Sequence, residues 1–315
     1  MRRIFVYEAF SAQRGDPDPA YADLLDAGRA MRDAIVLDLL DVPDIHVTCA
    51  TGDGPDCGLP LPHERLAGAA APDDRELDFI HAEQARHDAC WIVAPETGGR
   101  LEGLQAAVAP ERRIGCEPQA IRIAASKRAT LALMAAHGLA TPLLFDGADG
   151  WIVKPDDGAG TVATRWHARL ADAQAEHARR PGSVIEPFVM GEPLSIALLV
   201  DAEFSRCLAF NRQHIAIDDD GHLQDLGVEC AALDEAHDAR VPALRALAAR
   251  VVTALPGLRG VVGRDAIWIP GRGPVLVEVN PRVTSAYVGL SARLGRNVAR
   301  DVLHAAREVN HVAAG

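Results

Sequence analysis

Polar side chains that could hold a metal ion stand on two apolar segments in the last quarter of the chain. Alternation along a strand puts Glu278 and Asn280 of segment 275–282 on one face. A second strand-like segment, 261–269, carries Asp265. Mg²⁺ prefers oxygen ligands and usually takes one or two protein groups besides phosphate and water. The pattern predicts metal-bound nucleotide between two neighbouring strands, and the alternative is a hairpin whose ends are merely acidic.

A lysine ends another apolar segment, 151–154, and a glycine-containing turn, 156–161, follows it. Glycines let backbone N–H groups approach phosphates, and a lysine supplies a mobile positive charge. The turn lacks the Gly-x-x-x-x-Gly-Lys-Ser/Thr order of a P-loop, and by itself it is more typical of a plain hairpin. The order of the polar residues along the chain makes a phosphate-binding turn the stronger interpretation. These residues are Lys127, Lys154, Glu186, Glu192, Asp265, Glu278 and Asn280.

The composition limits the classes of protein that the chain can belong to. A net charge of −12 argues against general affinity for nucleic acid, which depends on neutralising phosphates. No segment approaches the ~18 apolar residues of a membrane span, and no targeting signal is recognisable, so we expect a cytoplasmic protein. The six cysteines form no Cys-x-x-Cys pair and the twelve histidines lack ligand spacing, which disfavours zinc and redox motifs.

Strands alternate with helices in residues 1–116, which predicts an N-terminal domain with a parallel sheet covered by helices. Ligand-binding loops of such sheets lie at the carboxyl ends of the strands. Glu8 and Glu96 follow the first and third expected strands and are therefore candidates for substrate contact; the alternative is a loop carboxylate or a helix cap. Residues 51–72 are rich in Gly and Pro and are expected to form an irregular loop.

A second unit begins near residue 117 and is expected to extend to about 310. Residues 120–137 are predicted to form one helix that carries Lys127, and a hairpin with Lys154 follows it. Further strands are expected at 183–189, 194–200 and 206–210, with a helix at 242–255 before the two metal-ligand strands. The fold class is α/β and α+β.

This order of residues resembles the ATP-grasp superfamily of ATP-dependent carboxylate–amine ligases over essentially the whole chain. The resemblance implies a pre-ATP-grasp domain (1–116) and an ATP-grasp region (117–310), with a lid at about 142–183 and a C-terminal mixed-sheet subdomain at about 184–310. It also implies that ATP binds with Mg²⁺ or Mn²⁺, as two ions. The metal ligands would be Asp265, Glu278 and Asn280.

The resemblance implies roles for further residues. Lys127, Lys154 and the lid glycines Gly158 and Gly160 would contact the phosphates. The hinge strand would hydrogen-bond adenine through its backbone, Glu192 would hold the ribose, and Arg282, Lys154 and Arg212 would offset charge on the transferred phosphoryl. The hinge residues are Glu186, Pro187, Phe188 and Val189.

Segments 5–8, 92–97, 211–213 and 278–290 look like the branch of the family that contains tyramine–glutamate ligase of methanofuran synthesis, with relatives in methylofuran synthesis. The branch implies an amide between the γ-carboxyl of L-glutamate and an aromatic amine or amino acid, formed through an acyl phosphate. Thr284 and Ser285 would lie near these substrates. The chain departs from the branch at Ser11-Ala12-Gln13 and at Arg264, which leaves the amine open between tyramine and tyrosine.

Two alternatives stay open: another ATP-grasp ligase of amino acids or peptides, and a nucleotide-binding regulatory protein without turnover. The complete set of two lysines and three metal ligands argues against the second. The partners expected are small molecules, with no nucleic acid and no membrane. The sequence does not determine the oligomeric state, and a homodimer is an open alternative.

Overall fold

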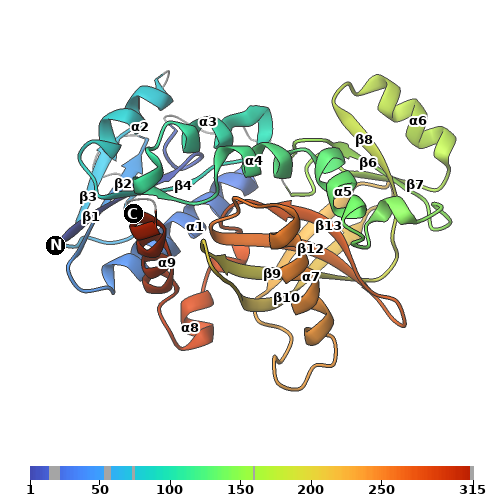
Figure 1. The fold of residues 1–315 in the computed structure, drawn as a ribbon. Helices are drawn as coiled ribbons and strands as arrows, with labels where there is room; N and C mark the ends of the chain where they lie inside the picture. Colours follow the sequence, from blue (N-terminus) through green and yellow to red (C-terminus); the bar gives the residue numbers. More distant parts are fainter. Residues whose placement is uncertain (14–21, 53–57, 73–74, 159, 313–315) are drawn as a thin grey trace.

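A computed structural model describes residues 1–13, 22–52, 58–72, 75–158 and 160–312. In these ranges the strands form three sheets that follow one another along the chain (Figure 1). No helix among the described residues is long and apolar enough to cross a membrane.

The N-terminal sheet has the strand order β3-β2-β1-β4-β5, and all its pairs are parallel. Its central strands are continuous apolar runs because both faces are covered by helices. Its strands are β1 (Arg2–Glu8), β2 (Ile45–Thr51), β3 (Leu66–Ala70), β4 (Ala89–Val93) and β5 (Arg113–Ile114). The parallel arrangement brings Glu8 and the loop after β4 to the same edge of the sheet.

The C-terminal sheet is antiparallel, with the order β11-β10-β9-β12-β13. Its strands are β9 (Glu192–Val200), β10 (Ser205–Ile217), β11 (Leu223–Glu229), β12 (Gly260–Ile269) and β13 (Gly273–Asn280). A small third sheet, β7-β6-β8, has its own strand pairing (Figure 1) and touches the β10–β11 turn of the C-terminal sheet, where the Trp166 backbone N–H donates to the Gly221 carbonyl at 2.7 Å. It consists of β6 (Trp151–Pro155), β7 (Arg165–His167) and β8 (Ser183–Pro187). Together with α6 (Leu170–Arg179) it spans most of the expected lid.

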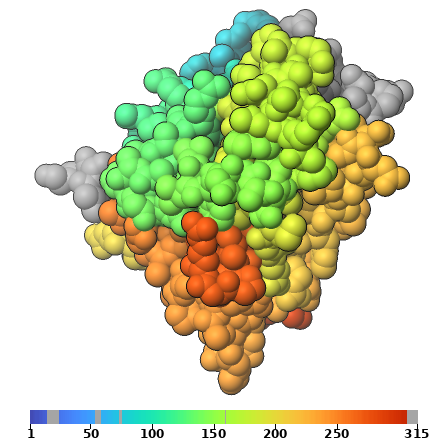
Figure 2. Space-filling view, turned by 90° about the vertical axis from the view of Figure 1, so that its right-hand side faces the viewer, coloured from blue at the N-terminus to red at the C-terminus, as the bar shows by residue number. Residues whose placement is uncertain are grey.

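The other α-helices are α1 (Ala22–Leu40), α2 (Glu76–Gln84), α3 (Arg100–Ala106), α4 (Pro118–Ala125), α5 (Lys127–Ala136), α7 (Val241–Ala254), α8 (Leu290–Leu294) and α9 (Val298–Val312). The short 3₁₀ segments are η2 (Thr97–Gly99), η3 (Pro110–Arg112), η4 (Pro142–Leu144) and η5 (Ser285–Tyr287). In Figure 2 the small sheet and α6 (yellow-green) stand beside the α4–α5 region (green).

The N-terminal and C-terminal sheets share their hydrophobic cores. One core joins Phe5 of β1 to Ile196 of β9 and Val251 of α7. The other joins Val6 of β1 to Leu199 of β9, under α1 and α9. Each face of β1 therefore belongs to a core that continues into the C-terminal sheet. This packing fixes the carboxyl edge of the N-terminal sheet relative to β12 and β13, which carry the predicted metal ligands.

Three expectations from the sequence differ from the structure. The range 51–72 contains β3, whose small residues (Leu-Ala-Gly-Ala-Ala) give no strand signal but pair with β2. The helix expected at 120–137 is two helices, because Ser126 is extended and its hydroxyl caps α5 by accepting the Ala129 N–H. The strand expected at 206–210 continues to Ile217 and pairs with β11, an exposed strand that the sequence did not reveal.

Candidate functional site

The three predicted metal ligands are adjacent on the hairpin of β12 and β13. Asp265 pairs directly with Glu278 across the hairpin. The Asn280 side-chain amide donates to Asp265 Oδ2 at 3.0 Å, and Gln213 of β10 donates to Oδ1 at 3.0 Å. Two carboxylates and a side-chain amide thus converge from neighbouring strands. We call Asp265, Glu278 and Asn280 the metal cluster, because the sequence predicts that they bind metal.

The electrostatics of this cluster fit a cation. Burial, and then repulsion from the adjacent Glu278 carboxylate, raise the pKa of Asp265 to about 7. Hydrogen bonds from Asn280 and Gln213 oppose that rise. A bound divalent ion would reverse this repulsion. Among the described residues no group of three or more His, Cys, Asp or Glu side chains gathers as a metal site. Mg²⁺ prefers oxygen ligands such as carboxylates and amides, whereas zinc sites are built mainly from Cys and His.

Lys127 links this cluster to the turn after β6. Because Ser126 caps α5, Lys127 becomes the first residue of that helix. Its ammonium lies 3.2 Å from the Glu278 carboxylate and donates to the Gly158 carbonyl at 2.5 Å. A buried ammonium thus stands between the metal-ligand strand and the glycine turn.

Lys154 lies on β6 and pairs with Glu186 on β8, with Nζ 2.7 Å from Oε2. Both side chains are buried, and Glu186 Oε1 has no hydrogen-bond partner among the residues that the structure describes. The Phe188 N–H donates to the Gly150 carbonyl at 2.9 Å. Pro187 ends β8, an edge strand of its sheet, and because backbone groups alternate along a strand its carbonyl would point away from β6. Val189 lies just beyond the end of this strand.

Glu192 and Arg212 contact each other on neighbouring strands. Arg212 Nε donates to Glu192 Oε1 at 2.9 Å, and its Nη1 donates to Glu229 at 2.9 Å. The second oxygen of Glu192 contacts Arg240, the residue just before α7. The structure thus groups Arg212 with the residue expected at the ribose, whereas the next residue, Gln213, reaches the metal cluster.

Arg282 follows β13 and pairs with Glu96, which follows β4. Its Nη2 donates to Glu96 Oε2 at 3.0 Å. Its Nε lies 3.0 Å from Oε1, an ion-pair contact without the alignment of a hydrogen bond. Burial would lower the pKa of Arg282, but Glu96, Glu278 and Asp265 raise it above its ordinary value. Arg282 is therefore a fixed positive charge beside the metal cluster.

Glu8 occupies a different environment from Glu96. Its carboxylate is buried and accepts the N–H groups of Phe10 at 3.1 Å and Ser11 at 2.7 Å. Burial raises its pKa, which these hydrogen bonds oppose. A Cβ at Gly28 of α1 would lie 2.7 Å from the carboxylate, so glycine makes room for it. Glu8 thus anchors the loop Ser11-Ala12-Gln13 in which the chain departs from the family pattern.

The last two candidates lie just beyond Arg282. Thr284 precedes η5 and is half-buried against Gly263 of β12, where an added Cβ would lie 2.7 Å from its methyl group. Ser285 is exposed. Neither is hydrogen-bonded to the metal cluster in the structure.

Sequence reasoning did not single out two further contacts. Gln213 was part of the segment that resembles the family, but only the pairing of β10 with β9 brings it to Asp265. Asp157 of the glycine turn accepts the Gly98 N–H at 2.9 Å, and its carbonyl accepts the Thr97 hydroxyl at 3.0 Å. No local pattern signals this contact between residues far apart in the sequence.

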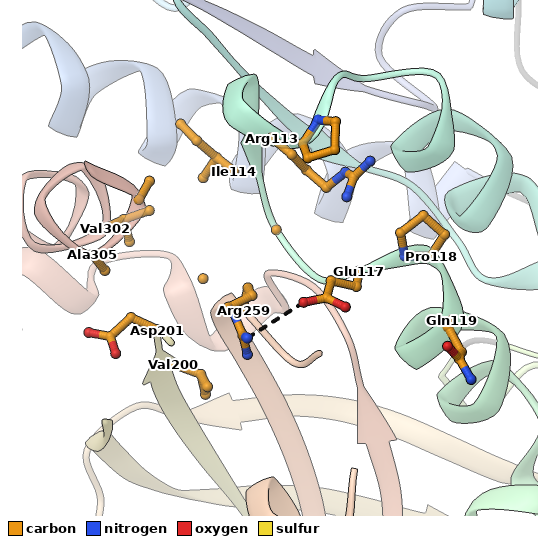
Figure 3. A pocket seen from close by; sticks show the side chains of 14 residues that line it. Arg113, Ile114, Glu117, Pro118, Gln119, Val200, Asp201, Arg259, Val302 and Ala305 are labelled. Atoms are coloured by element: carbon orange, nitrogen blue, oxygen red, sulfur yellow. Dashed lines mark ion pairs between the residues drawn. The ribbon is translucent and has the colours of Figure 1, made fainter. Parts of the chain in front are cut away.

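A cavity of about 330 Å³ lies elsewhere, at the seam between the N-terminal domain and the C-terminal sheet. Figure 3 shows Arg113, Asp201 and Arg259 around it, with an ion pair of 3.5 Å between Arg259 and Glu117. None of the predicted site residues lines it. The candidate site residues gather instead where the β12–β13 hairpin meets Lys127 and the loop after β4.

Comparison with known families agrees with this geometry. Residues 124–286 match the family described as the ATP-grasp domain, and residues 55–121 match the pre ATP-grasp 3 domain. The first match covers more than half of the 315 residues. The chain therefore belongs to the ATP-grasp family, and the fold expected from the sequence is confirmed.

Individual relatives are more distant. A tyramine–L-glutamate ligase from Methanocaldococcus jannaschii is 27% identical over 206 residues, which are 64% of this chain and 58% of that protein. The chain thus spans under two thirds of that relative's length. An ATP-grasp superfamily protein from Archaeoglobus fulgidus has a TM-score of 0.71 at 21% identity, covering 96% of this chain and 88% of its own. A D-alanine–D-alanine ligase from Coxiella burnetii has a TM-score of 0.68 at 13% identity, and the match covers 100% of this chain and 97% of that ligase.

Proposed function

We propose that the protein is an ATP-dependent carboxylate–amine ligase that joins the γ-carboxyl of L-glutamate to an aromatic amine, tyramine or tyrosine. ATP would be converted to ADP through an acyl phosphate, as part of methylofuran-type cofactor synthesis. The observation that carries the ligase proposal is the convergence of Asp265, Glu278 and Asn280 with Lys127 and Arg282 in an ATP-grasp chain. The similarity to tyramine–L-glutamate ligase supports the choice of substrates.

The hinge suits an adenine ring. The amino group of adenine is a donor and its N1 is an acceptor, which complement the Pro187 carbonyl and the Val189 N–H. The unpartnered Glu186 Oε1 offers a further acceptor in a buried position. Lys154, already paired with Glu186, would approach the phosphates from the same side. Glu192 would accept the ribose hydroxyls with the lone pairs that Arg212 and Arg240 leave free.

The polar residues near the hairpin suit the phosphoryl groups. Mg²⁺ held by Asp265, Glu278 and Asn280 would neutralise phosphate charge and orient the terminal phosphate. Lys127 and Arg282 would add fixed positive charges that need no reorganisation during transfer. Gly158 and Gly160 would let the turn lie close to the phosphates and exclude water, which would otherwise hydrolyse the acyl phosphate.

Glu96 is the better placed of the two N-terminal carboxylates to influence the substrates. It holds Arg282 at the edge where the parallel strands end. Glu8 instead orders the loop after β1, so we propose that it shapes the amine site indirectly. Thr284 and Ser285 are proposed to line the site on the β13 side.

The test is a product screen by mass spectrometry. Purified protein is incubated with ATP, Mg²⁺ and L-glutamate, and with tyramine, tyrosine or another amine in separate reactions. The expected product is a γ-glutamyl amide formed in a 1:1 ratio with ADP. A different acid–amine pair as the sole productive one would overturn the substrates but keep the ligase. Nucleotide binding with no ligation of any pair would favour a regulatory nucleotide-binding protein.

A further inference from the structure

The turn after β6 contacts two separate parts of the molecule, the start of α5 and the loop after β4, through three consecutive residues. Asp156 accepts the Arg128 N–H at 2.9 Å at the start of α5. The Gly158 carbonyl accepts the Lys127 ammonium at 2.5 Å. Asp157, between them, faces the N-terminal domain and has no part in the nucleotide contacts proposed above. Its role therefore needs a separate explanation.

Asp157 is held by the loop after β4. The Gly98 N–H donates to Asp157 Oδ2 at 2.9 Å, and the Thr97 hydroxyl donates to the Asp157 carbonyl at 3.0 Å. Gly98 and Gly99 have φ values of 65° and 71°, in the left-handed region that favours glycine. The glycines give the loop the conformation in which its N–H meets the carboxylate. Both the turn, through Asp157, and the loop after β4, through its glycine conformations, are therefore needed for this contact.

The same loop reaches the site at its other end. Glu96 immediately precedes Thr97 and pairs with Arg282 beside the metal cluster. A short, continuous segment therefore connects Arg282, the N-terminal domain and the glycine turn. Whatever shifts Glu96 also acts on the position of Thr97 and Gly98.

We propose that Asp157, Thr97 and Gly98 form a latch that holds the glycine turn closed over the nucleotide and couples this closure to the acid and amine site. The coupling rests on the proposed ligase function, whereas the latch itself does not. Asp157 is a positioning residue, because it acts through the turn and touches no reacting atom. By linkage, substrates that favour the latched loop tighten nucleotide binding, and nucleotide tightens substrate binding by the same factor.

The latch is tested first without any acid or amine. Calorimetry measures the affinity of the Mg²⁺ complex of the non-hydrolysable ATP analogue adenylyl imidodiphosphate. We expect Asp157→Ala to weaken binding by about three- to tenfold, the scale of one typical net hydrogen bond. Thr97→Val should weaken binding less, and Asp157→Asn, which keeps an acceptor oxygen, should recover part of the loss.

Asp172→Ala is the matched control, because Asp172 is an exposed carboxylate on α6 whose ion pair with Arg169 stays within that helix region. It should bind the analogue as the parent protein does. Amide hydrogen exchange adds a local readout: exchange in a peptide containing Gly98 should slow when the analogue binds, and should not slow in Asp157→Ala. Unchanged affinity together with unchanged protection of that peptide in Asp157→Ala would overturn the latch.

The coupling is tested second, with L-glutamate and tyramine as probes. Analogue affinity is measured with and without both, and a typical coupling is about 5- to 150-fold. We expect this factor to fall towards one in Asp157→Ala. If the coupling factor is as large in Asp157→Ala as in the parent protein, the proposed link is wrong. If the parent protein shows no coupling, the proposed substrates are contradicted, and the first test of the latch still holds.

Discussion

Glu96 and Arg282 belong to different domains, yet Arg282 Nη2 donates to Glu96 Oε2 at 3.0 Å. Their side chains are only 6% and 12% exposed, so either charge alone would be poorly solvated. The pair joins the carboxyl edge of the N-terminal sheet to the strand that carries Glu278 and Asn280. If Arg282 moved away, the buried Glu96 carboxylate would lose its ion pair, so the position of Arg282 relative to the metal cluster is fixed.

Neutralising only Glu96 or only Arg282 should lower the free energy of unfolding more than expected from replacing both. We expect Glu96→Gln and Arg282→Gln each to lower the free energy of unfolding by about 3–5 kcal/mol, because each leaves an uncompensated charge. The double variant should lose clearly less than the sum of the two. Urea unfolding measures all three variants against the parent protein, and additive losses would show that the two side chains do not interact in solution.

Replacing the metal ligands should separate activity from stability. We expect Glu278→Gln and Asn280→Ala to abolish turnover while circular dichroism stays unchanged. Without metal, Glu278→Gln should shift the melting temperature little, because relief of the repulsion with the buried Asp265 offsets the loss of the ion pair with the buried Lys127 ammonium. Melting in EDTA and across a Mg²⁺ titration with ATP tests both effects. Near-normal activity in both variants would contradict the metal assignment.

The lysines on either side of the glycine turn should both matter for phosphoryl transfer. We expect Lys127→Ala and Lys154→Ala to lower kcat by ~10²-fold or more, the scale of losing one preorganised charge. Lys154→Ala also strands the buried Glu186, so it should lose stability as well. The double variant with Glu186→Gln should regain stability without regaining rate. Unchanged nucleotide affinity in both single variants, by calorimetry, would contradict their placement.

Much of the fold follows from periodicity that is visible in the sequence. Segments such as Ile4–Tyr7 in β1 and Cys90–Val93 in β4 are continuous apolar runs because both faces of the sheet are buried. Alternation placed Glu278 and Asn280 together. The sequence did not predict β3 or β11, since small residues in one and exposed polar residues in the other carry no apolar period.

The site was less predictable than the fold because its contacts are long-range. Arg282 and Glu96 are separated by 186 residues, and Gln213 and Asp265 by 52. Neither contact has a local signature, since each depends on how two sheets meet or which strands are neighbours. Arg212 illustrates the limit: strand pairing turns it to Glu192 and turns its neighbour Gln213 to the metal cluster.

Arg264 should be a source of instability. It is fully buried in the C-terminal sheet, and none of its guanidinium nitrogens has a hydrogen-bond partner among the described residues. Burial lowers its pKa to about 10. We expect Arg264→Met, which keeps an unbranched apolar chain, to raise the free energy of unfolding by about 1–4 kcal/mol without loss of activity. Thermal and urea unfolding measure this gain, and destabilisation would indicate that the guanidinium is solvated in the core.

Asp38 should make the junction between α1 and the segment after β13 sensitive to pH. Its Oδ2 accepts the Tyr287 hydroxyl at 2.8 Å and the Ser291 hydroxyl at 2.5 Å. Burial, and then the nearby Asp41, raise the pKa of Asp38 above its ordinary 3.8, although both hydroxyl hydrogen bonds oppose that rise. The folded protein therefore holds this proton more tightly than the unfolded chain does.

The sign of the effect follows from that difference. As the pH rises past the unfolded pKa, the unfolded chain releases the proton first, so the contribution of Asp38 to stability falls until the pH passes the folded pKa. Asp38→Asn removes this titration and keeps an oxygen to accept the hydroxyls. We expect the variant to gain stability relative to the parent protein as the pH rises from below 3.8, the ordinary pKa, to neutral pH, measured by urea unfolding in the same buffers. A difference that stays constant over this range would show that Asp38 titrates alike in the folded and unfolded states.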